Sequence, residues 1–232
     1  MLTVHHLETS RSQRILWLLE ELGVPYTLKR YQRDPHTRLA PPELRQVHPL
    51  GKSPVITDGE DVIAESGAII EHLADLYGAG ASGELGDLGQ LVPARGTPEH
   101  RQCRFWMHYA EGSLMNWLML KLVFNTLPRQ PMPFFARPIA RGICDKASRK
   151  LVDPNLSTAL AFMNDHLSRS TWFAGDAITI ADFQMSFPVE AALTRVKNVD
   201  QYQHVHALRE RMRARPAYQR ALEKGGPVVM SS

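Results

Sequence analysis

Residues 49–73 read PLGKSPVITDGEDVIAESGAIIEHL, and this stretch decides the fold. Ser53-Pro54 stands directly before the apolar residues 55–57. A proline has no backbone N–H, so it suits the start of a strand. Asp58-Gly59 then supplies a tight turn into a second short apolar run, and Glu65-Ser66 opens a helix. The stretch therefore predicts a loop, a β-hairpin and a helix.

The start of that helix is a candidate ligand site. The first turn of a helix carries unpaired backbone N–H groups and the positive end of the helix dipole, which together favour a carboxylate. A peptide-like ligand that lies along the Ser53 backbone would place its carboxylate at Ser66. This placement is our first hypothesis about function.

Composition restricts the class of protein. The chain has 232 residues, 44% of them hydrophobic and 22% charged, which is typical of a soluble globular protein with one large or two small domains. No run approaches the roughly 18–20 apolar residues of a membrane span, so we expect no membrane partner. Cys103 and Cys144 have neither metal-ligand nor disulfide spacing, and the ten histidines form no ligand pattern. We expect a cytoplasmic protein without a metal site.

A run of arginines lies near the end of the chain, at positions 209, 211, 213, 215 and 220. Such a run can bind nucleic acid or another acidic surface. Aromatic residues, on which the bases of a single strand would stack, are not interleaved with these arginines. We therefore interpret the run as the solvated face of a late helix and predict no nucleic-acid partner.

The first 78 residues alternate between strand and helix patterns. Strands are predicted at 2–6 and 26–30, and between them a helix with one apolar stripe at 12–22, ended by Gly23. A short helix at 41–47 precedes the hairpin. The order β-α-β, a connecting helix, then β-β-α predicts a mixed sheet whose first two strands are parallel.

Strand patterns largely vanish after a glycine-rich segment at 79–96, which we interpret as a linker. Thr97-Pro98 is predicted to start one helix and Asp153-Pro154 another. A third helix starts at Thr179, where Asp182 completes a capping box. Because this third helix is apolar nearly all round, we expect it to be the buried core of an all-helical domain.

Three motifs in this order, Pro49–Ile56, Glu65–Ile70 and Ile178–Asp182, make the whole chain resemble the cytosolic glutathione transferase superfamily. The resemblance implies a fold class of α/β plus all-α. Residues 1–78 would form a thioredoxin-like domain (βαβ-α-ββα) that binds glutathione. Residues 97–232 would form an all-helical domain with the pocket for the electrophile. It further implies a cis peptide bond at Pro54, a homodimer and a role in detoxification.

Glutathione carries a thiol whose ordinary pKa of about 8.5 leaves little thiolate at neutral pH. Ser10 lies four residues before Arg14, a spacing similar to that of the activating serine in the theta-like members. The resemblance therefore points to the serine-type, theta-like branch, with Ser10 as the hydrogen-bond donor to the thiolate. Thr9 and Ser12 are the alternatives, and a plain helix cap is the other role open to Ser10.

The resemblance also assigns the residues that bind glutathione. Ser53 and Pro54 would contact the cysteinyl portion, Glu65 the ammonium group, Ser66 the γ-glutamyl carboxylate, and Lys52 the glycyl carboxylate. Where the family often has an asparagine before the loop proline, this chain has His48. Glutathione would be a co-substrate, and no other cofactor is predicted.

The predicted activity is the addition of glutathione thiolate to small apolar electrophiles, with the reduction of organic hydroperoxides as a close variant. The alternative is a non-catalytic binding or scaffold protein on the same fold. A scaffold would be expected to lose the residues that contact glutathione, and Pro54, Glu65, Ser66 and a hydroxyl at position 10 are all present.

Overall fold

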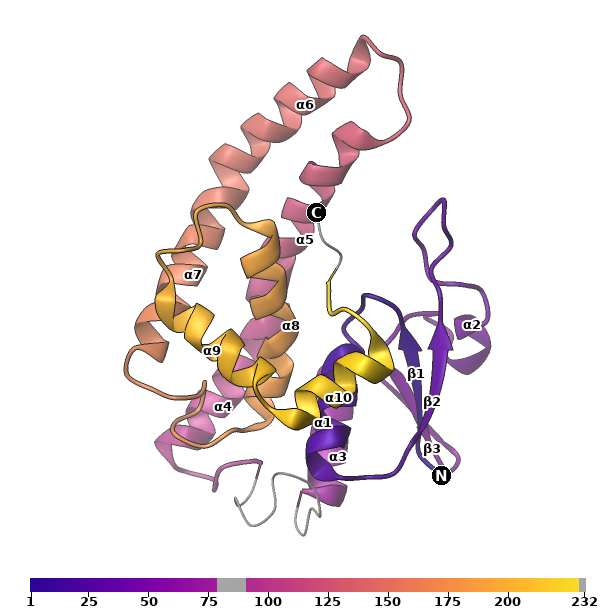
Figure 1. Ribbon diagram of the computed structural model, residues 1–232, viewed down its shortest axis with the longest axis vertical. Helices are drawn as coiled ribbons and strands as arrows, with labels where there is room; N and C mark the ends of the chain where they lie inside the picture. Colours follow the sequence, from indigo (N-terminus) through magenta and orange to yellow (C-terminus); the bar gives the residue numbers. More distant parts are fainter. Residues whose placement is uncertain (79–90, 230–232) are drawn as a thin grey trace.

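The computed structural model describes residues 1–78 and 91–229 (Figure 1). Four strands form one mixed sheet in the order β2-β1-β3-β4, in which β1 and β2 are parallel and the other pairs antiparallel. The strands are β1 (Thr3–Leu7), β2 (Thr27–Tyr31), β3 (Val55–Asp58) and β4 (Asp61–Ala64). The predicted mixed sheet with a parallel first pair is confirmed.

The hairpin follows the predicted local chemistry. The peptide bond between Ser53 and Pro54 is cis, as predicted, and it directly precedes β3. Asp58 pairs with Asp61 across a two-residue turn. The first residue of that turn, Gly59, has a φ of 62°, a left-handed conformation that glycine adopts readily.

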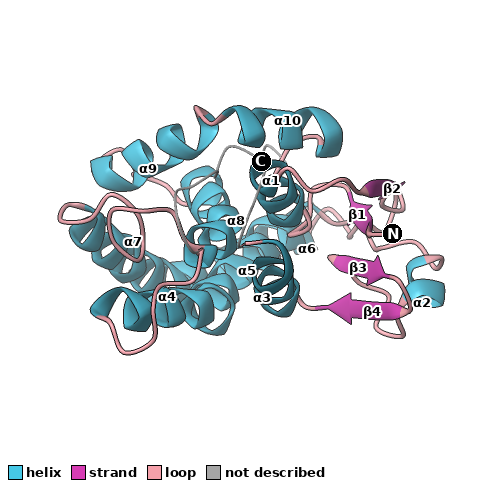
Figure 2. Ribbon diagram, turned by 90° about the horizontal axis from the view of Figure 1, so that it is seen from below, coloured by secondary structure: helices cyan, strands magenta, loops and turns pink. Residues whose placement is uncertain are grey.

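Two helices lie beside the sheet, α1 (Gln13–Leu22) and α3 (Ser66–Tyr77), and the short α2 (Leu44–Val47) connects β2 to the hairpin. Figure 2 shows α1 and α3 between the strands on one side and α4, α7 and α8 on the other. The predicted end of α1 is confirmed, because Gly23 has a φ of 67° and closes the helix. The sequence shows one apolar stripe in this segment, which predicts a helix with one buried face, and the structure buries more of α1 than that. All ten of its residues are buried, because α3, α8 and α10 also pack on it.

From residue 91 onward the named elements are all helical. Figure 1 shows α5 running up to a loop and α6 returning beside it. A five-residue π-helical segment at Ala110–Leu114 joins α4 to α5, and a second one at Ser148–Val152 joins α6 to α7. The helices are α4 (Pro98–Tyr109), α5 (Met115–Thr126), α6 (Ala136–Ala147), α7 (Asp153–Leu167), α8 (Ile180–Arg195), α9 (Gln203–Arg213) and α10 (Pro216–Gly225).

The predicted helix start at Asp153-Pro154 is confirmed, because α7 begins at Asp153. The chain is already helical from Ala136, through α6 and the π-helical segment. Proline normally disrupts a helix because it lacks an N–H and its ring clashes with the preceding turn. Here the wider π-helical turn immediately upstream breaks the regular hydrogen-bond ladder, so the proline is tolerated at the junction. The predicted linker at 79–96 lies mostly outside the described residues.

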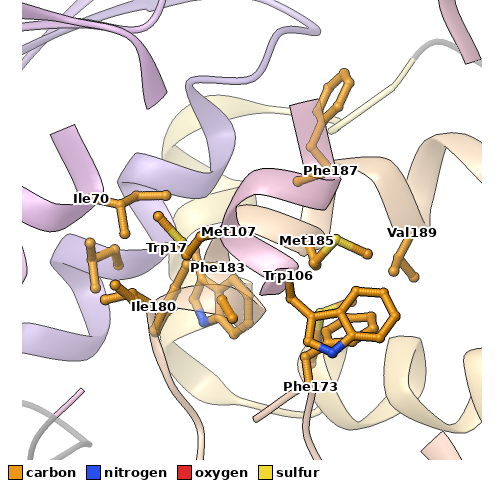
Figure 3. Packing of buried hydrophobic residues seen from close by; sticks show 14 of the residues in the cluster. Trp17, Ile70, Trp106, Met107, Phe173, Ile180, Phe183, Met185, Phe187 and Val189 are labelled. Carbon is orange, nitrogen blue, oxygen red and sulfur yellow. The ribbon is translucent and has the colours of Figure 1, made fainter. Parts of the chain in front are cut away.

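Helix α8 is the centre of the core, as predicted. Every residue from Ile180 to Leu193 is buried. Trp17 of α1 packs on Phe183 of α8 with ring centroids 4.5 Å apart, and Trp106 of α4 packs on Phe173 at 4.6 Å (Figure 3). The Trp17–Phe183 contact joins the helical part of the chain to the first helix of the sheet region, and the Trp106–Phe173 contact lies within the helical part.

The capping box at the start of α8 is confirmed. The carboxylate of Asp182 accepts the backbone N–H of Thr179 at 2.8 Å and its hydroxyl at 3.1 Å. The other carboxylate oxygen accepts the backbone N–H of Phe173 at 2.9 Å. Asp182 therefore caps the helix and also fixes the loop that precedes it.

The interpretation of the arginine run as a solvated face is wrong. Arg213 forms two hydrogen bonds, of 2.7 and 2.8 Å, with the buried carboxylate of Glu190. Arg215 holds the fully buried carboxylate of Glu21 in the same bidentate way, and Arg220 pairs with Glu20 at 3.0 Å.

The local sequence pattern does not reveal these arginine–glutamate ion pairs. Successive helix residues are rotated by about 100°, so arginines two positions apart point in different directions and need separate partners. The partners Glu20 and Glu21 lie 200 and 194 residues upstream of Arg220 and Arg215. These ion pairs therefore hold α9 against α8 and α10 against α1.

Neither stretch, 1–78 or 91–229, contains a helix long and apolar enough to cross a bilayer. Within the same residues, no group of three histidine, cysteine or acidic side chains is placed to hold a metal ion.

Candidate active site

A cavity of about 110 Å³ lies where the loop before β3, the start of α3, the turn before α1 and the first π-helical segment meet. All five residues predicted to bind glutathione lie in its wall. The complete lining is Arg11, His48, Leu50, Lys52, Ser53, Pro54, Ala64, Glu65, Ser66 and Glu111. The wall thus combines two acidic and two arginine or lysine side chains with the start of a helix.

The loop before β3 is fastened to the first strand through Ser53. Its hydroxyl donates to the backbone carbonyl of His5 at 2.8 Å and accepts the backbone N–H of Leu7 at 3.2 Å. The side chain of Ser53 is therefore engaged with β1. A ligand in the cavity would meet the backbone of this residue.

Glu65, directly before α3, has a φ of 72° and a ψ of 122°. A left-handed backbone is uncommon for a residue with a side chain, and it costs about 1–3 kcal/mol. Such strain persists where the surrounding structure imposes it, often at binding sites. Here it places the Glu65 side chain in the cavity wall, and the carbonyl of Glu65 accepts the N–H of Ile69 in the first turn of α3.

Arg14 supports the cavity from within the protein. Its Nη1 donates to Glu111 Oε1 at 3.0 Å and to Ser66 Oγ at 3.3 Å. Burial lowers the pKa of Arg14 to about 10, so the group remains charged at neutral pH. Because a guanidinium can only donate, Ser66 must accept from it, and the Ser66 hydroxyl proton is left to donate to a ligand.

A buried chain of hydrogen bonds leads from Ser10 into the protein. Ser10 Oγ lies 2.7 Å from Ser12 Oγ, and Ser12 Oγ lies 2.8 Å from His6 Nδ1. His6 Nε2 lies 2.8 Å from the carbonyl oxygen of Gly225 at the end of α10. The C-terminal helix is thereby connected to the turn before α1.

The direction of each bond in this chain follows from its last acceptor. A carbonyl only accepts, so His6 Nε2 carries the proton. Burial lowers the pKa of His6, so its ring is neutral and Nδ1 is a bare acceptor. Ser12 must donate to Nδ1, and the Ser10 hydroxyl must donate to Ser12. Ser10 Oγ also accepts the backbone N–H of Ser12 at 3.2 Å, which is the contact a capping side chain makes.

Comparison with known proteins decides the family. The family model of the glutathione S-transferase N-terminal domain matches residues 10–76, and that of the C-terminal domain matches residues 127–216. Glutathione S-transferase 3 of Schizosaccharomyces pombe is 35% identical over 224 residues, which cover 97% of this chain and 88% of that protein. The chain belongs to the glutathione S-transferase family. It is an enzyme of this family, not a scaffold built on the same fold.

Further relatives of this transferase agree. Glutathione S-transferase 1 of Saccharomyces cerevisiae is 30% identical over 84% of this chain and 82% of its own length. A crystal structure of a glutathione S-transferase from Actinobacillus pleuropneumoniae superposes with a TM-score of 0.73 and 32% identity, covering 97% of this chain and 93% of that one. The thioredoxin-like fold with a helical second part is therefore confirmed. The serine-type, theta-like branch remains a prediction.

The residues predicted for catalysis lie behind the cavity wall of this transferase. Ser10 is 6% exposed and Ser12 is fully buried, whereas Thr9 is half-buried with a left-handed φ of 47°. None of the three belongs to the lining, although Arg11, the residue between Ser10 and Ser12, does.

The sequence interpretation missed three members of this site. His6 and Glu111 were not singled out, and Arg14 was considered only as a charge near the thiolate. Glu111 lies 97 residues from its partner Arg14, and Gly225 lies 219 residues from His6. No local spacing signals such pairs, because only the packed fold brings them together.

Proposed function

We propose that this transferase holds glutathione in the described cavity, stabilises its thiolate at the turn before α1 and adds it to a small electrophile with an apolar body. The observation that carries the proposal is the convergence of Lys52, Ser53, Pro54, Glu65 and Ser66 on one cavity. These residues were chosen from sequence motifs, and the cavity brings all of them together next to the Ser10 turn.

The charges of glutathione match the wall of the cavity. Glutathione has one ammonium group and two carboxylates. Glu65 pairs with the ammonium group, and the Ser66 hydroxyl and the first turn of α3 receive the γ-glutamyl carboxylate. Lys52 receives the glycyl carboxylate. The Ser53 backbone pairs with the cysteinyl portion as an added strand would.

Ser10 is the proposed donor to the thiolate. In the ligand-free chain its proton points to Ser12, so it must turn outward to serve the sulfur. Giving up a neutral hydrogen bond costs about 1 kcal/mol, whereas a bond to a charged acceptor contributes about 1.5–3 kcal/mol. A thiolate therefore competes successfully with Ser12 for this proton. Thr9 and Ser12 stay the alternatives.

The remaining expectations belong to the same proposal. The thiolate would also reduce organic hydroperoxides, and detoxification would be the biological role. Residues 1–78 would bind glutathione and residues 97–232 would bind the electrophile. We further propose a homodimer of the serine-type, theta-like branch. Cys103 and Cys144 are both free and buried, which suits a reducing compartment such as the cytoplasm.

Glu65→Gln is expected to weaken glutathione binding about tenfold, because the amide keeps the shape but loses the charge that pairs with the ammonium group. Isothermal titration calorimetry with glutathione measures the effect. The matched control is Glu60→Gln, an exposed residue in the hairpin turn, which should bind as the wild type does. An unaltered dissociation constant in Glu65→Gln would count against this placement of the γ-glutamyl group.

A further inference from the structure

Positive charge is in excess beside the cavity. Arg11 lies within electrostatic reach of both Arg14 and Arg195. Glu111 is the carboxylate that pairs with two of them: its Oε1 lies 3.0 Å from Arg14 and its Oε2 lies 3.3 Å from Arg11 Nε. Three guanidinium groups are thus set against one carboxylate.

Among the described residues, no carboxylate is paired with Arg195. It is the last residue of α8, and it is half-buried. Its Nη1 is buried and has no hydrogen-bond partner among the described residues. Burial and the neighbouring charge of Arg11 both lower the pKa of Arg195, so the two guanidinium groups repel each other where water is partly excluded.

Arg14 adds to the same excess. It is 1% exposed, and its Nε and Nη2 also lack hydrogen-bond partners in the described part of the chain. Buried donors are nearly always paired in folded proteins, so several unpaired guanidinium nitrogens at one place call for an explanation. The positive end of α1 lies at the same turn and strengthens the field. An anion at this place would satisfy the donors and remove the repulsion.

Glutathione does not account for the whole excess. In the proposed function its two carboxylates are taken by Ser66 and Lys52, and its ammonium group by Glu65. Even if Arg14 also favours the γ-glutamyl carboxylate through Ser66, Arg11 pairs only with Glu111, which Arg14 shares, and no carboxylate of the described residues is paired with Arg195.

We propose that Arg11 and Arg195 form a subsite for an anionic group, a carboxylate or a sulfonate, on the electrophile. Arg11 lines the cavity, and Arg195, at the end of α8, lies within electrostatic reach of Arg11. The preferred electrophile would then have an apolar body that carries the reacting carbon, together with one acidic group. This inference rests on the proposed function and adds the substrate class to it.

A matched pair of substrates tests the subsite. In 4-chloro-3,5-dinitrobenzoate and its methyl ester the thiolate attacks the same ring carbon, the C–S bond forms, and chloride leaves with the C–Cl electron pair. Only the acid carries a negative charge. Rates are expressed relative to the uncatalysed reaction of each compound with glutathione, which removes their different intrinsic reactivity.

The wild-type enzyme is expected to accelerate the acid at least tenfold more than the ester at low ionic strength, since a hydrogen-bonded charge pair contributes about that factor. Added salt should reduce the preference. Arg195→Met should bring the ratio of the two accelerations close to one, and Arg195→Lys should retain part of it. The control Arg137→Met removes the same charge from an exposed position on α6 and should keep the wild-type ratio.

The outcomes separate the two claims. If the wild-type enzyme conjugates both compounds without preferring the acid, the subsite is wrong and the proposed function stands. A preference that survives in Arg195→Met likewise overturns the subsite. If neither compound is conjugated, the proposed function fails and the subsite with it. The ratio of the two accelerations in the wild-type enzyme tests the subsite even if Arg195→Met does not fold.

Discussion

Ser10→Ala is expected to lower kcat/KM for conjugation about a hundredfold, the usual effect of removing one hydrogen-bond donor from a developing anion. The dissociation constant of glutathione should change by no more than a few fold, because the tripeptide is held by the loop before β3 and the start of α3. Steady-state kinetics with a neutral aryl halide and calorimetry with glutathione measure the two quantities.

The pH profile gives a second measurement on the same variant. A hydrogen bond of about 1.5–3 kcal/mol to the thiolate corresponds to a pKa of bound glutathione lower by about one to two units. Ser10→Ala should therefore shift the acidic limb of the kcat/KM profile upward by that amount. Thr9→Val and Ser12→Ala are the matched comparisons. Unchanged turnover in Ser10→Ala, with a loss in Thr9→Val, would move the role to Thr9.

Asp182→Ala is expected to lower the free energy of unfolding by about 3–5 kcal/mol, a large share of the stability of an ordinary domain. The carboxylate is completely buried and accepts three hydrogen bonds, from two backbone N–H groups and one hydroxyl. Burial raises the pKa of Asp182 to about 6, so at pH 7.5 it is ionised and these bonds are charge-assisted. Alanine would leave all three donors without a partner inside the core.

Urea denaturation at pH 7.5 measures this effect. Asp165→Ala is the control, because the Asp165 carboxylate is mostly exposed and pairs with the similarly exposed Arg169 just beyond the end of α7, so its loss should cost less than about 1 kcal/mol. Equal stability of the Asp182 and Asp165 variants would contradict the role given to the buried cap.

Much of the fold could be predicted because its signals are local. The turn at Gly59, the end of α1 at Gly23 and the capping box at Thr179 each depend on residues within three or four positions. Each of these predictions is confirmed. The errors arose where tertiary contacts override the local pattern. Arg213, Arg215 and Arg220 bind buried carboxylates of α8 and α1 that lie 23, 194 and 200 residues away in the sequence.

The residues of the site also fall into two groups, those that a local sequence motif predicts and those that only tertiary contacts bring together. Lys52, Ser53, Pro54, Glu65 and Ser66 lie within fifteen positions, so their motif could be read from the sequence, and all five line one cavity. The residues that support the cavity from behind its lining could not be predicted from the sequence. Arg14 meets Glu111 only after the helical part packs on α1. His6 meets the carbonyl of Gly225 only after α10 docks on α1.

The structure of the chain in complex with glutathione tests the central claim most directly. We expect the cysteinyl backbone to pair with Ser53, the γ-glutamyl carboxylate to lie at Ser66 and the start of α3, and the sulfur to lie within about 3.5 Å of Ser10 Oγ, whose hydroxyl has turned away from Ser12. A complex in which the tripeptide lies outside this cavity, or whose sulfur is remote from the turn before α1, would contradict the account.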